Sequence, residues 1–395
     1  MKNILLITSL YPSKDIKILN NTAVCHYFAK EWKNMGYNVR VIFCYHCYPF
    51  YYYPLLKILA KFLANKAGIA VMTSNSSKIS EYTLDGIKVS RIPIKKNRPG
   101  GHFSKKEIVK LKSRILNILA NENYRPDIIL GHFTHPSVDV VSRLKEVFTK
   151  SKTAVTIHGK EEKFETHTQK LLFNIDYIGY RSLPIKNVFE SLYGYHSYFM
   201  CPSGVPQEYI IDSPRIFRDY ANRFVYVGAF MKRKYPSVIV PAVHSVYGNQ
   251  DYSITFIGDG NGKNDIVRTA KEVGNLGRIT FTGRLQRDAV KAYLDIADVF
   301  IMISKLETFG LVYLEAMARG CIVVASKNEG MEGIIVNGKN GFLCEAGNER
   351  ELAKIIGFIK GLSLSELSKI SEAGRQTAIR MTDKIVAKEY IDIFN

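Results

Sequence analysis

The sequence has few acidic residues for its many basic ones, no long apolar run and no ordered set of cysteines. No stretch approaches the roughly 18 uninterrupted apolar residues of a membrane-spanning helix, and the apolar run within residues 1–10 is too short for a secretory signal. The six cysteines are scattered, which indicates a reducing, cytoplasmic compartment. We therefore expect neither a transmembrane protein nor a disulfide-stabilised secreted domain.

Metal-binding and redox motifs are also missing. Cys44 and Cys47 have the C-x-x-C spacing, but no second pair of Cys or His follows at the distance of a zinc site. His132 and His135 are three positions apart and lack a partner carboxylate or cysteine pattern. The sequence therefore predicts buried strand cysteines, no metal and no other cofactor.

The charge of the chain is uneven. Lys and Arg number 55 against 36 Asp and Glu, which gives a formal net charge of +19. Residues 1–205 hold 30 basic and 14 acidic residues, whereas residues 206–395 hold 25 and 22. The N-terminal half is expected to meet an anionic partner, either nucleic acid or a membrane surface. No known nucleic-acid-binding module is recognisable, so we expect no nucleic acid and favour an anionic membrane.

Residues 45–70 give this basic half an amphipathic segment. Tyrosine and phenylalanine crowd residues 45–53, and Lys57, Lys61 and Lys66 then alternate with leucine, isoleucine and phenylalanine. Such a pattern is typical of a helix that lies in a membrane interface. A helix that packs on the core with lysines toward water has the same pattern, and the overall basicity of the chain favours the membrane.

The length and the order of the elements predict two α/β domains. A chain of 395 residues is too long for one ordinary core. An apolar strand, a helix and a second strand within residues 3–44 predict the start of a Rossmann-like domain. A Pro- and Gly-rich break at 201–206 precedes a second α/β series. We expect an N-terminal domain of residues 1–205, a C-terminal domain of residues 206–375, and a helix at 376–395 that returns to the N-terminal domain.

Two motifs of the N-terminal half bear on function or on folding. Residues 153–157 predict a buried strand, and His158 follows it, at the end of the strand where α/β sheets place ligands. Asp85 and Gly86 predict the turn of a hairpin over residues 78–93.

The most informative stretch is residues 299–320, which predict a buried strand, a short loop and a helix that stops at Gly320. Glu307 lies in the loop and Glu315 in the helix. The start of the helix offers free N–H groups to an anion, and the second carboxylate lies roughly 10 Å along the helix at about 1.5 Å per residue. This spacing suits a diphosphate with a hydroxyl-bearing sugar at each end, as in a nucleotide sugar.

The residues from 307 to 320, E-T-F-G-L-V-Y-L-E-A-M-A-R-G, resemble the E-x7-E signature of family 4 retaining glycosyltransferases. This family has the GT-B fold and builds bacterial surface polysaccharides. Other blocks agree with it in the same order, at residues 225–234, 257–260, 281–283, 297–304 and 329–343. The resemblance is continuous over residues 223–350 and weaker over residues 1–205.

The resemblance implies a GT-B fold, in which two Rossmann-like domains face each other across a cleft for the sugar donor. It implies a metal-independent hexosyltransferase that uses a UDP- or GDP-linked sugar and retains the anomeric configuration. The acceptor would be a glycan or a lipid-linked glycan in the assembly of surface polysaccharide, capsule or lipopolysaccharide. The enzyme would be peripheral to the inner face of the cell membrane.

The resemblance also implies roles for individual residues. Glu307 would bind hydroxyls of the transferred sugar, Glu315 the ribose, and Lys234 the leaving phosphate. The backbone N–H groups of Phe309, Gly310 and Leu311 would bind the diphosphate, and His158 would face the donor sugar and phosphate. The remaining expected contacts to the sugar donor come from Gly228, Arg233, Arg284, Leu285 and Asn21.

Two positions depart from the family pattern. Ala229 occupies the place of the usual arginine, and we expect Arg233 or Lys232 to replace its charge. The glycine-rich loop that usually follows the family's N-terminal strand reads Asn20-Asn21-Thr22 here. Two alternatives stay open: a nucleotide-sugar epimerase of the same fold, and a non-catalytic basic protein that binds membranes or polyanions.

Overall fold

The computed structural model describes residues 1–16, 18–19, 22–67, 71–73, 76, 78–99, 101–159, 166–217 and 219–395. These residues form two compact units. Unit 1 contains Met1–Arg181, Ile185–Pro202 and Val386–Asn395, and unit 2 contains Ser182–Pro184 and Ser203–Ile385. The passage from one unit to the other at Pro202 and Ser203 lies within the Pro- and Gly-rich break of the sequence.

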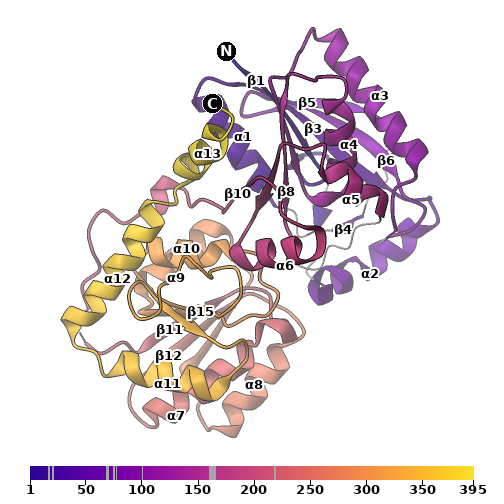
Figure 1. Cartoon of the computed structure of the whole chain (residues 1–395). Coiled ribbons are helices and arrows are strands. Elements are labelled where there is room, and N and C mark those ends of the chain that lie inside the picture. The colour runs from indigo at the N-terminus through magenta and orange to yellow at the C-terminus, as the bar shows by residue number, and fades with distance from the viewer. Residues whose placement is uncertain are drawn as a thin grey trace. The chain divides into compact units, whose positions relative to one another are not determined.

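Unit 1 is built on an eight-stranded sheet in the order β10-β9-β8-β7-β1-β3-β6-β5 (Figure 1). All neighbouring strands are parallel except β5 and β6, which form the hairpin predicted around Asp85. Asp85 and Gly86 have φ angles of 48° and 70°, as a tight hairpin turn requires. The strands are β1 (Asn3–Thr8), β3 (Asn38–Cys47), β5 (Ser80–Leu84), β6 (Ile87–Lys95), β7 (Ile128–His132), β8 (Lys152–Ile157), β9 (Tyr177–Tyr180) and β10 (Tyr198–Met200). A separate antiparallel pair joins β2 (Ile18–Leu19) to β4 (Val71–Met72).

The helices of unit 1 are α1 (Val24–Asn34), α2 (Tyr52–Ala67), α3 (Lys105–Asn121), α4 (Thr134–Lys145), α5 (Thr166–Leu172), α6 (Leu183–Tyr193) and α13 (Asp383–Asp392). The helix α4 contains a kink at His135, because the residue before a proline is disfavoured in the helical region. The helix α13 lies beside α1 (Figure 1), where Trp32 Nε1 donates to the carbonyl oxygen of Ala387 at 2.8 Å.

Unit 2 contains a six-stranded, fully parallel sheet in the order β13-β12-β11-β14-β15-β16. Its strands are β11 (Arg223–Val227), β12 (Ser253–Ile257), β13 (Ile279–Gly283), β14 (Val299–Ile301), β15 (Ile322–Ser326) and β16 (Phe342–Cys344). Its helices are α7 (Ile239–Tyr247), α8 (Lys263–Glu272), α9 (Arg287–Ile296), α10 (Leu311–Ala318), α11 (Glu349–Lys360) and α12 (Leu364–Ile379). The helix α12 crosses the predicted end of the C-terminal domain at residue 375.

The helix α10 belongs to the core of unit 2. Its residues from 313 to 318 are all buried, and its apolar side chains pack with those of the sheet. A helix that is apolar on every side is stable only when protein surrounds it. The N-terminus of α10 is therefore held in a fixed place.

Both sheets share a topological feature that marks a ligand site. In chain order, the strands of unit 2 run 3-2-1-4-5-6, and unit 1 follows the same order when the hairpin strand β5 is left out. The order reverses between β1 and β7 in unit 1 and between β11 and β14 in unit 2. In such sheets, ligands bind at the carboxyl ends of the strands beside the point of reversal.

Candidate active site

The loop from β14 to α10 lies beside the point of reversal in unit 2. Leu306 and Gly310 have φ angles of 59° and 83° there, and the side chain of Phe309 is buried. Gly310 is the N-cap of α10, and no side chain in the described part of the chain caps this helix end. The N–H groups of Gly310 and Leu311, together with the helix dipole, can therefore stabilise an anion.

Lys234 and Glu307 meet at the same place. Lys234 ends the 3-10 helix η2 (Lys232–Lys234), which follows β11, whereas Glu307 follows β14. Lys234 Nζ donates to Glu307 Oε2 at 3.0 Å, and Ser304 Oγ donates to the same oxygen at 3.3 Å. The two side chains of the pair are 15% and 14% exposed. Residues 73 positions apart in the chain therefore form one shielded ion pair.

The surroundings keep Glu307 ionised. Burial by itself would raise its pKa, but the Lys234 ammonium, the Arg233 charge and the Ser304 hydroxyl outweigh burial and lower the pKa below its usual value. An ionised carboxylate only accepts hydrogen bonds. Glu307 is thus prepared to accept hydrogen bonds from hydroxyl groups.

Glu329 is a site residue that the sequence analysis did not single out. Its Oε2 accepts a hydrogen bond from the backbone N–H of Glu307 at 2.9 Å. The backbone of the next residue, Gly330, approaches Phe309 so closely that a Cβ there would lie 2.4 Å from the Phe309 Cα. The loop after β15 therefore fixes the loop that carries Glu307. The block at 329–343, which resembles the family, was the available signal in the sequence.

Glu315 is held by a second missed residue, Arg287. Arg287 begins α9, and its Nε and Nη2 lie 2.8 and 2.7 Å from Glu315 Oε1. Burial raises the pKa of Glu315, and Arg287 only partly opposes this effect. The Arg287 guanidinium also lies 4.9 Å from the ring centre of Tyr209. The carboxylate predicted to bind ribose is therefore already oriented.

Arg233 binds the backbone of the Glu307 loop. Its Nη1 donates to the carbonyl oxygens of Lys305 and Leu306 at 3.2 and 3.4 Å, and Lys305 N donates to Arg233 O at 2.7 Å. Arg233 thus positions the loop and adds positive charge near Glu307. Whether it replaces the family's arginine, absent at Ala229, stays a prediction.

The glycine-rich turn after β12 has a packing role. A Cβ on Gly258 would lie 1.9 Å from the carbonyl oxygen of Gly228, and one on Gly260 would lie 2.6 Å from that of Phe230. The turn therefore lets two loops approach at the carboxyl ends of β11 and β12. Arg284 and Leu285 directly follow β13 at the same edge of the sheet, with Arg284 exposed and Leu285 packed against the core.

His158 lies in unit 1, where it pairs with His132. Its Nε2 lies 3.1 Å from His132 Nδ1, and its ring stacks on Phe133 with 4.0 Å between ring centres. Burial, followed by the charge of Arg181, lowers the pKa of His132 to about 3 and that of His158 well below the usual value. Both imidazoles are therefore neutral at pH 7, and one donates while the other accepts. The sequence analysis did not foresee this pair.

Three further expectations concern Asn21, metal binding and membrane-spanning helices. Asn21 lies outside the described residues. Within those residues, no group of three or more His, Cys, Asp and Glu side chains is placed to hold a metal ion. Among the described helices, none is both long enough and apolar enough to cross a bilayer.

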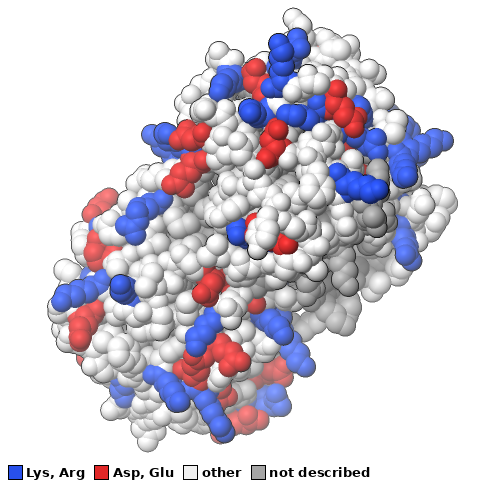
Figure 2. All heavy atoms as spheres, viewed as in Figure 1, with Lys and Arg blue, Asp and Glu red and all other residues white. Residues whose placement is uncertain are grey.

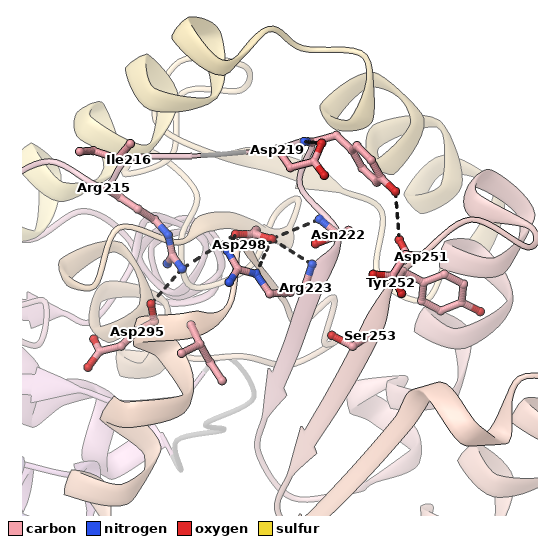
Figure 3. A pocket seen from close by; sticks show the side chains of 12 residues that line it. Arg215, Ile216, Asp219, Asn222, Arg223, Asp251, Tyr252, Ser253, Asp295 and Asp298 are labelled. Carbon is pink, nitrogen blue, oxygen red and sulfur yellow. Dashed lines mark hydrogen bonds and ion pairs between the residues drawn. The ribbon is translucent and has the colours of Figure 1, made fainter.

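A hollow of about 630 Å³ in unit 2 lies at the opposite, amino-terminal ends of the strands (Figure 3). Its arginines and Asp298 are engaged in hydrogen bonds. Asp298 accepts from Arg223 Nε and Nη2 at 3.0 and 2.7 Å and from the backbone N–H groups of Asn222 and Arg223. Arg215 Nη2 donates to the carbonyl oxygen of Asp295 at 2.9 Å. These contacts join strand starts, so we place the site at the carboxyl ends instead.

Residues 212–377 match the family described as glycosyl transferases group 1. The lipopolysaccharide core biosynthesis glycosyltransferase LpsE of Rhizobium meliloti is 29% identical over 153 residues. That match covers 39% of this chain and 43% of LpsE, so the chain spans less than half of this curated relative. These matches confirm the family resemblance that the blocks around Glu307 and Glu315 predicted.

Solved structures extend the likeness to both units. The lipopolysaccharide outer core galactosyltransferase WaaB superposes with a TM-score of 0.72 at 17% identity, over 99% of each chain. The Anabaena protein HepE, solved in complex with UDP, superposes with a TM-score of 0.68 at 16% identity, over 100% of this chain and 99% of HepE. At such identities the likeness establishes the fold alone.

Proposed function

Because this chain has the GT-B fold and its residues 212–377 belong to the group 1 glycosyl transferases, we propose that it transfers a sugar from a nucleoside diphosphate to an acceptor. The observation that carries the proposal is the Lys234–Glu307 pair beside the uncapped start of α10. A leaving diphosphate develops negative charge, and an ammonium and fixed N–H groups stabilise that charge without a metal. When the sugar donor binds, the Lys234 ammonium leaves Glu307 and pairs with the phosphate. Glu307 then accepts hydrogen bonds from hydroxyls of the sugar.

The sugar donor spans the start and the body of α10. Its diphosphate binds the N–H groups of Gly310 and Leu311, and its ribose hydroxyls donate to Glu315, which Arg287 orients. The UDP bound to HepE supports a nucleoside diphosphate as the ligand class. We infer a UDP- or GDP-linked hexose, because a diphosphate and two hydroxyl-bearing ends match the two carboxylates.

The reaction retains the configuration at the anomeric carbon. The sugar passes through an oxocarbenium-like state, which depends on positioning by Glu307 and the diphosphate more than on a strong base. Nuclear magnetic resonance of the product's anomeric proton tests this step. A product of inverted configuration would contradict retention while leaving glycosyl transfer intact.

The acceptor is a glycan or a lipid-linked glycan, and the enzyme is peripheral to the membrane. The names of LpsE and WaaB, which refer to lipopolysaccharide, support a surface-glycan acceptor. The basic first half and the exposed apolar side chains of α2 support contact with an anionic bilayer. Flotation with vesicles that contain an anionic lipid should carry the protein upward, and failure to float would overturn the membrane proposal.

The deciding experiment is a thermal-shift panel with UDP, GDP, ADP and their sugars. A ligand at about 100 times its Kd should stabilise the wild type by about 2.7 kcal/mol. Glu315→Ala should abolish the shift, whereas Glu272→Ala, an exposed glutamate at the end of α8, should keep it. The absence of any nucleotide-specific shift would overturn the proposed sugar-donor site. Isomerisation of the sugar donor without an acceptor would instead identify an epimerase.

A further inference from the structure

Unit 1 contains a hollow of about 370 Å³ at the carboxyl ends of β3 and β6. We name it the basic pocket, and the residues that matter to its chemistry are Tyr48, Phe50, Lys95, Lys96, Lys110 and Arg114. The pocket lies at the edge of a parallel sheet that favours ligands. It is separate from the residues of unit 2 that bind the sugar donor in the proposed function.

The charge of the basic pocket is positive and largely uncompensated. Among the described residues, Glu107 is the only acidic one that lines the pocket, and its carboxylate accepts the backbone N–H of Lys95 at 3.2 Å. Within the described part of the chain, no carboxylate forms an ion pair with Lys95, Lys96 or Lys110. Figure 2 shows Lys and Arg side chains on the side of unit 1 that carries α3. An anion would supply the missing counter-charge.

Lys96 is the half-buried lysine of the pocket, whereas Lys95 and Lys110 are exposed. Its Nζ lies 4.4 Å from the ring centre of Phe103, and burial lowers its pKa. The nearby His46 has a buried Nε2 with no hydrogen-bond partner among the described residues, and burial, then Lys96, lowers its pKa to about 3. A partly desolvated ammonium beside a neutral, unpartnered imidazole favours the binding of a multivalent oxyanion.

An exposed apolar surface continues from the pocket along α2. Phe50, which lines the pocket, is 80% exposed and meets the ring of Tyr51, which precedes α2, edge to face with 5.8 Å between ring centres. Leu55 and Ile58 on this helix are 53% and 78% exposed, whereas Leu56 is buried. At 100° per residue, Leu55 and Ile58 lie on the face opposite the buried one. Exposed large apolar residues in a continuous row indicate an interaction surface.

We propose that the basic pocket binds the phosphate or diphosphate of an acceptor whose hydrocarbon chain lies along the exposed face of α2. The uncompensated cations match the headgroup, and the row of Phe50, Leu55 and Ile58 matches the chain. This inference rests on the proposed function, because it names the acceptor class of the same reaction. It commits to a lipid phosphate rather than to a protein partner, because an apolar protein surface would leave the lysines unpaired.

The test uses calorimetric titration of the full chain with three probes: farnesyl diphosphate below its aggregation concentration, farnesol and inorganic pyrophosphate. The variant Lys96→Gln/Lys110→Gln should bind farnesyl diphosphate at least tenfold more weakly, since the loss of a single charge-assisted contact already weakens binding by about a factor of ten. The matched control Lys105→Gln/Lys106→Gln removes the same charge from exposed positions of α3 outside the pocket, and it should bind as the wild type does.

A second variant tests the apolar half of the proposal. Leu55→Ser/Ile58→Ser should weaken farnesyl diphosphate and leave pyrophosphate binding unchanged. The control Val109→Ser/Val147→Ser changes two other exposed apolar residues of unit 1 and should alter neither. Binding to the pocket should survive Lys234→Met, whereas loss of binding in that variant would place the probe at the sugar-donor site and overturn the inference.

The remaining outcomes are distinguishable. Equal affinity for farnesol and farnesyl diphosphate, or equal affinity of the lysine variant and its control, would overturn the phosphate site. Pyrophosphate that binds as tightly as farnesyl diphosphate would assign the pocket to a free anion and overturn the lipid part. A nucleotide-dependent thermal shift without binding of farnesyl diphosphate would overturn this inference and leave the proposed sugar-donor site intact. Farnesyl diphosphate binding without any nucleotide shift would overturn the acceptor role.

Discussion

At the residue scale, the chemistry of unit 2 depends on two carboxylates in contrasting surroundings. Glu307 has a lowered pKa because Lys234, Arg233 and Ser304 outweigh its burial. Glu315 has a raised pKa because its burial outweighs one arginine. Glu307 is therefore held in its ionised form, whereas the charge of Glu315 depends on the balance between its burial and Arg287.

The ion pair gives a prediction for turnover. Lys234→Met removes the ammonium next to the leaving phosphate, so release of nucleoside diphosphate should fall by about a factor of 100 or more. Lys271→Met, which removes an exposed lysine of α8, is the control and should stay near the wild-type rate. Equal rates for the two variants would show that Lys234 does not act on the leaving group.

The histidine pair gives a prediction for the stability of unit 1. A histidine with a lowered folded pKa stabilises the fold above its unfolded pKa near 6.5, and this contribution is lost as the pH falls below that value. Because the pKa of His132 in the folded protein is about 3, the free energy of unfolding should fall by about 1.4 kcal/mol for each pH unit between about 6.5 and 3.

The measurement is urea unfolding at pH 7.5 and 5.5, followed by the fluorescence of Trp32, the only tryptophan of the chain. His132→Asn should lose less stability between these pH values than the wild type does. The same loss in both proteins would mean that His132 has the same pKa in the folded and the unfolded state, which would contradict its lowered pKa.

At the element scale, the start of α10 depends on its N-cap residue, Gly310. Gly310 has a φ of 83°, and a Cβ there would lie 2.3 Å from the ring of Tyr313. That ring is itself fixed, since Tyr313 Oη donates to the carbonyl oxygen of Met302 at 2.6 Å. The helix start and the strand end are thus locked together around the anion site.

Gly310→Ala should therefore destabilise the protein by clearly more than the roughly 1 kcal/mol that a left-handed backbone alone imposes on alanine. Gly338→Ala is the matched control, because Gly338 has a φ of 78° and nothing within 4 Å of its Cβ position. Thermal unfolding compares the two variants, and nucleotide titration should show weaker binding only for Gly310→Ala. Equal melting temperatures would contradict the steric argument.

The elements near the site could largely be predicted, and their contacts could not. The strand, loop and helix of residues 299–320 followed from apolar runs and a glycine stop, which are local signals. Arg287 and Glu329 were missed because they come from α9 and from the loop after β15, and only strand order brings them to Glu315 and Glu307.

At the scale of the whole molecule, the end of the chain belongs to the fold of unit 1. Tyr390 of α13 is fully buried, with its ring 5.4 Å from Phe28, 5.2 Å from Trp32 and 4.6 Å from Phe199. Its hydroxyl lies 3.1 Å from Thr156 Oγ1. Unit 1 is thus completed by residues more than 180 positions after the rest of it.

Tyr390→Ala should remove about 3–5 kcal/mol from the stability of unit 1, because the surrounding rings cannot fill the cavity. The emission of Trp32 should shift to longer wavelength, and its unfolding midpoint in urea should fall. The nucleotide-induced thermal shift, which depends on unit 2, should persist. Tyr195→Ala, at a position that is 87% exposed, is the control, and a similar loss there would contradict the packing argument.

The sequence by itself determined the elements, the family and the residue types of the site, because periodicity, capping and the ordered blocks around Glu307 and Glu315 are local in the chain. Only the tertiary structure decided which groups meet. The pairs Lys234–Glu307, Arg287–Glu315 and His132–His158 join residues that no local pattern connects. Such contacts depend on strand order and burial, which also set whether each carboxylate or imidazole carries a charge.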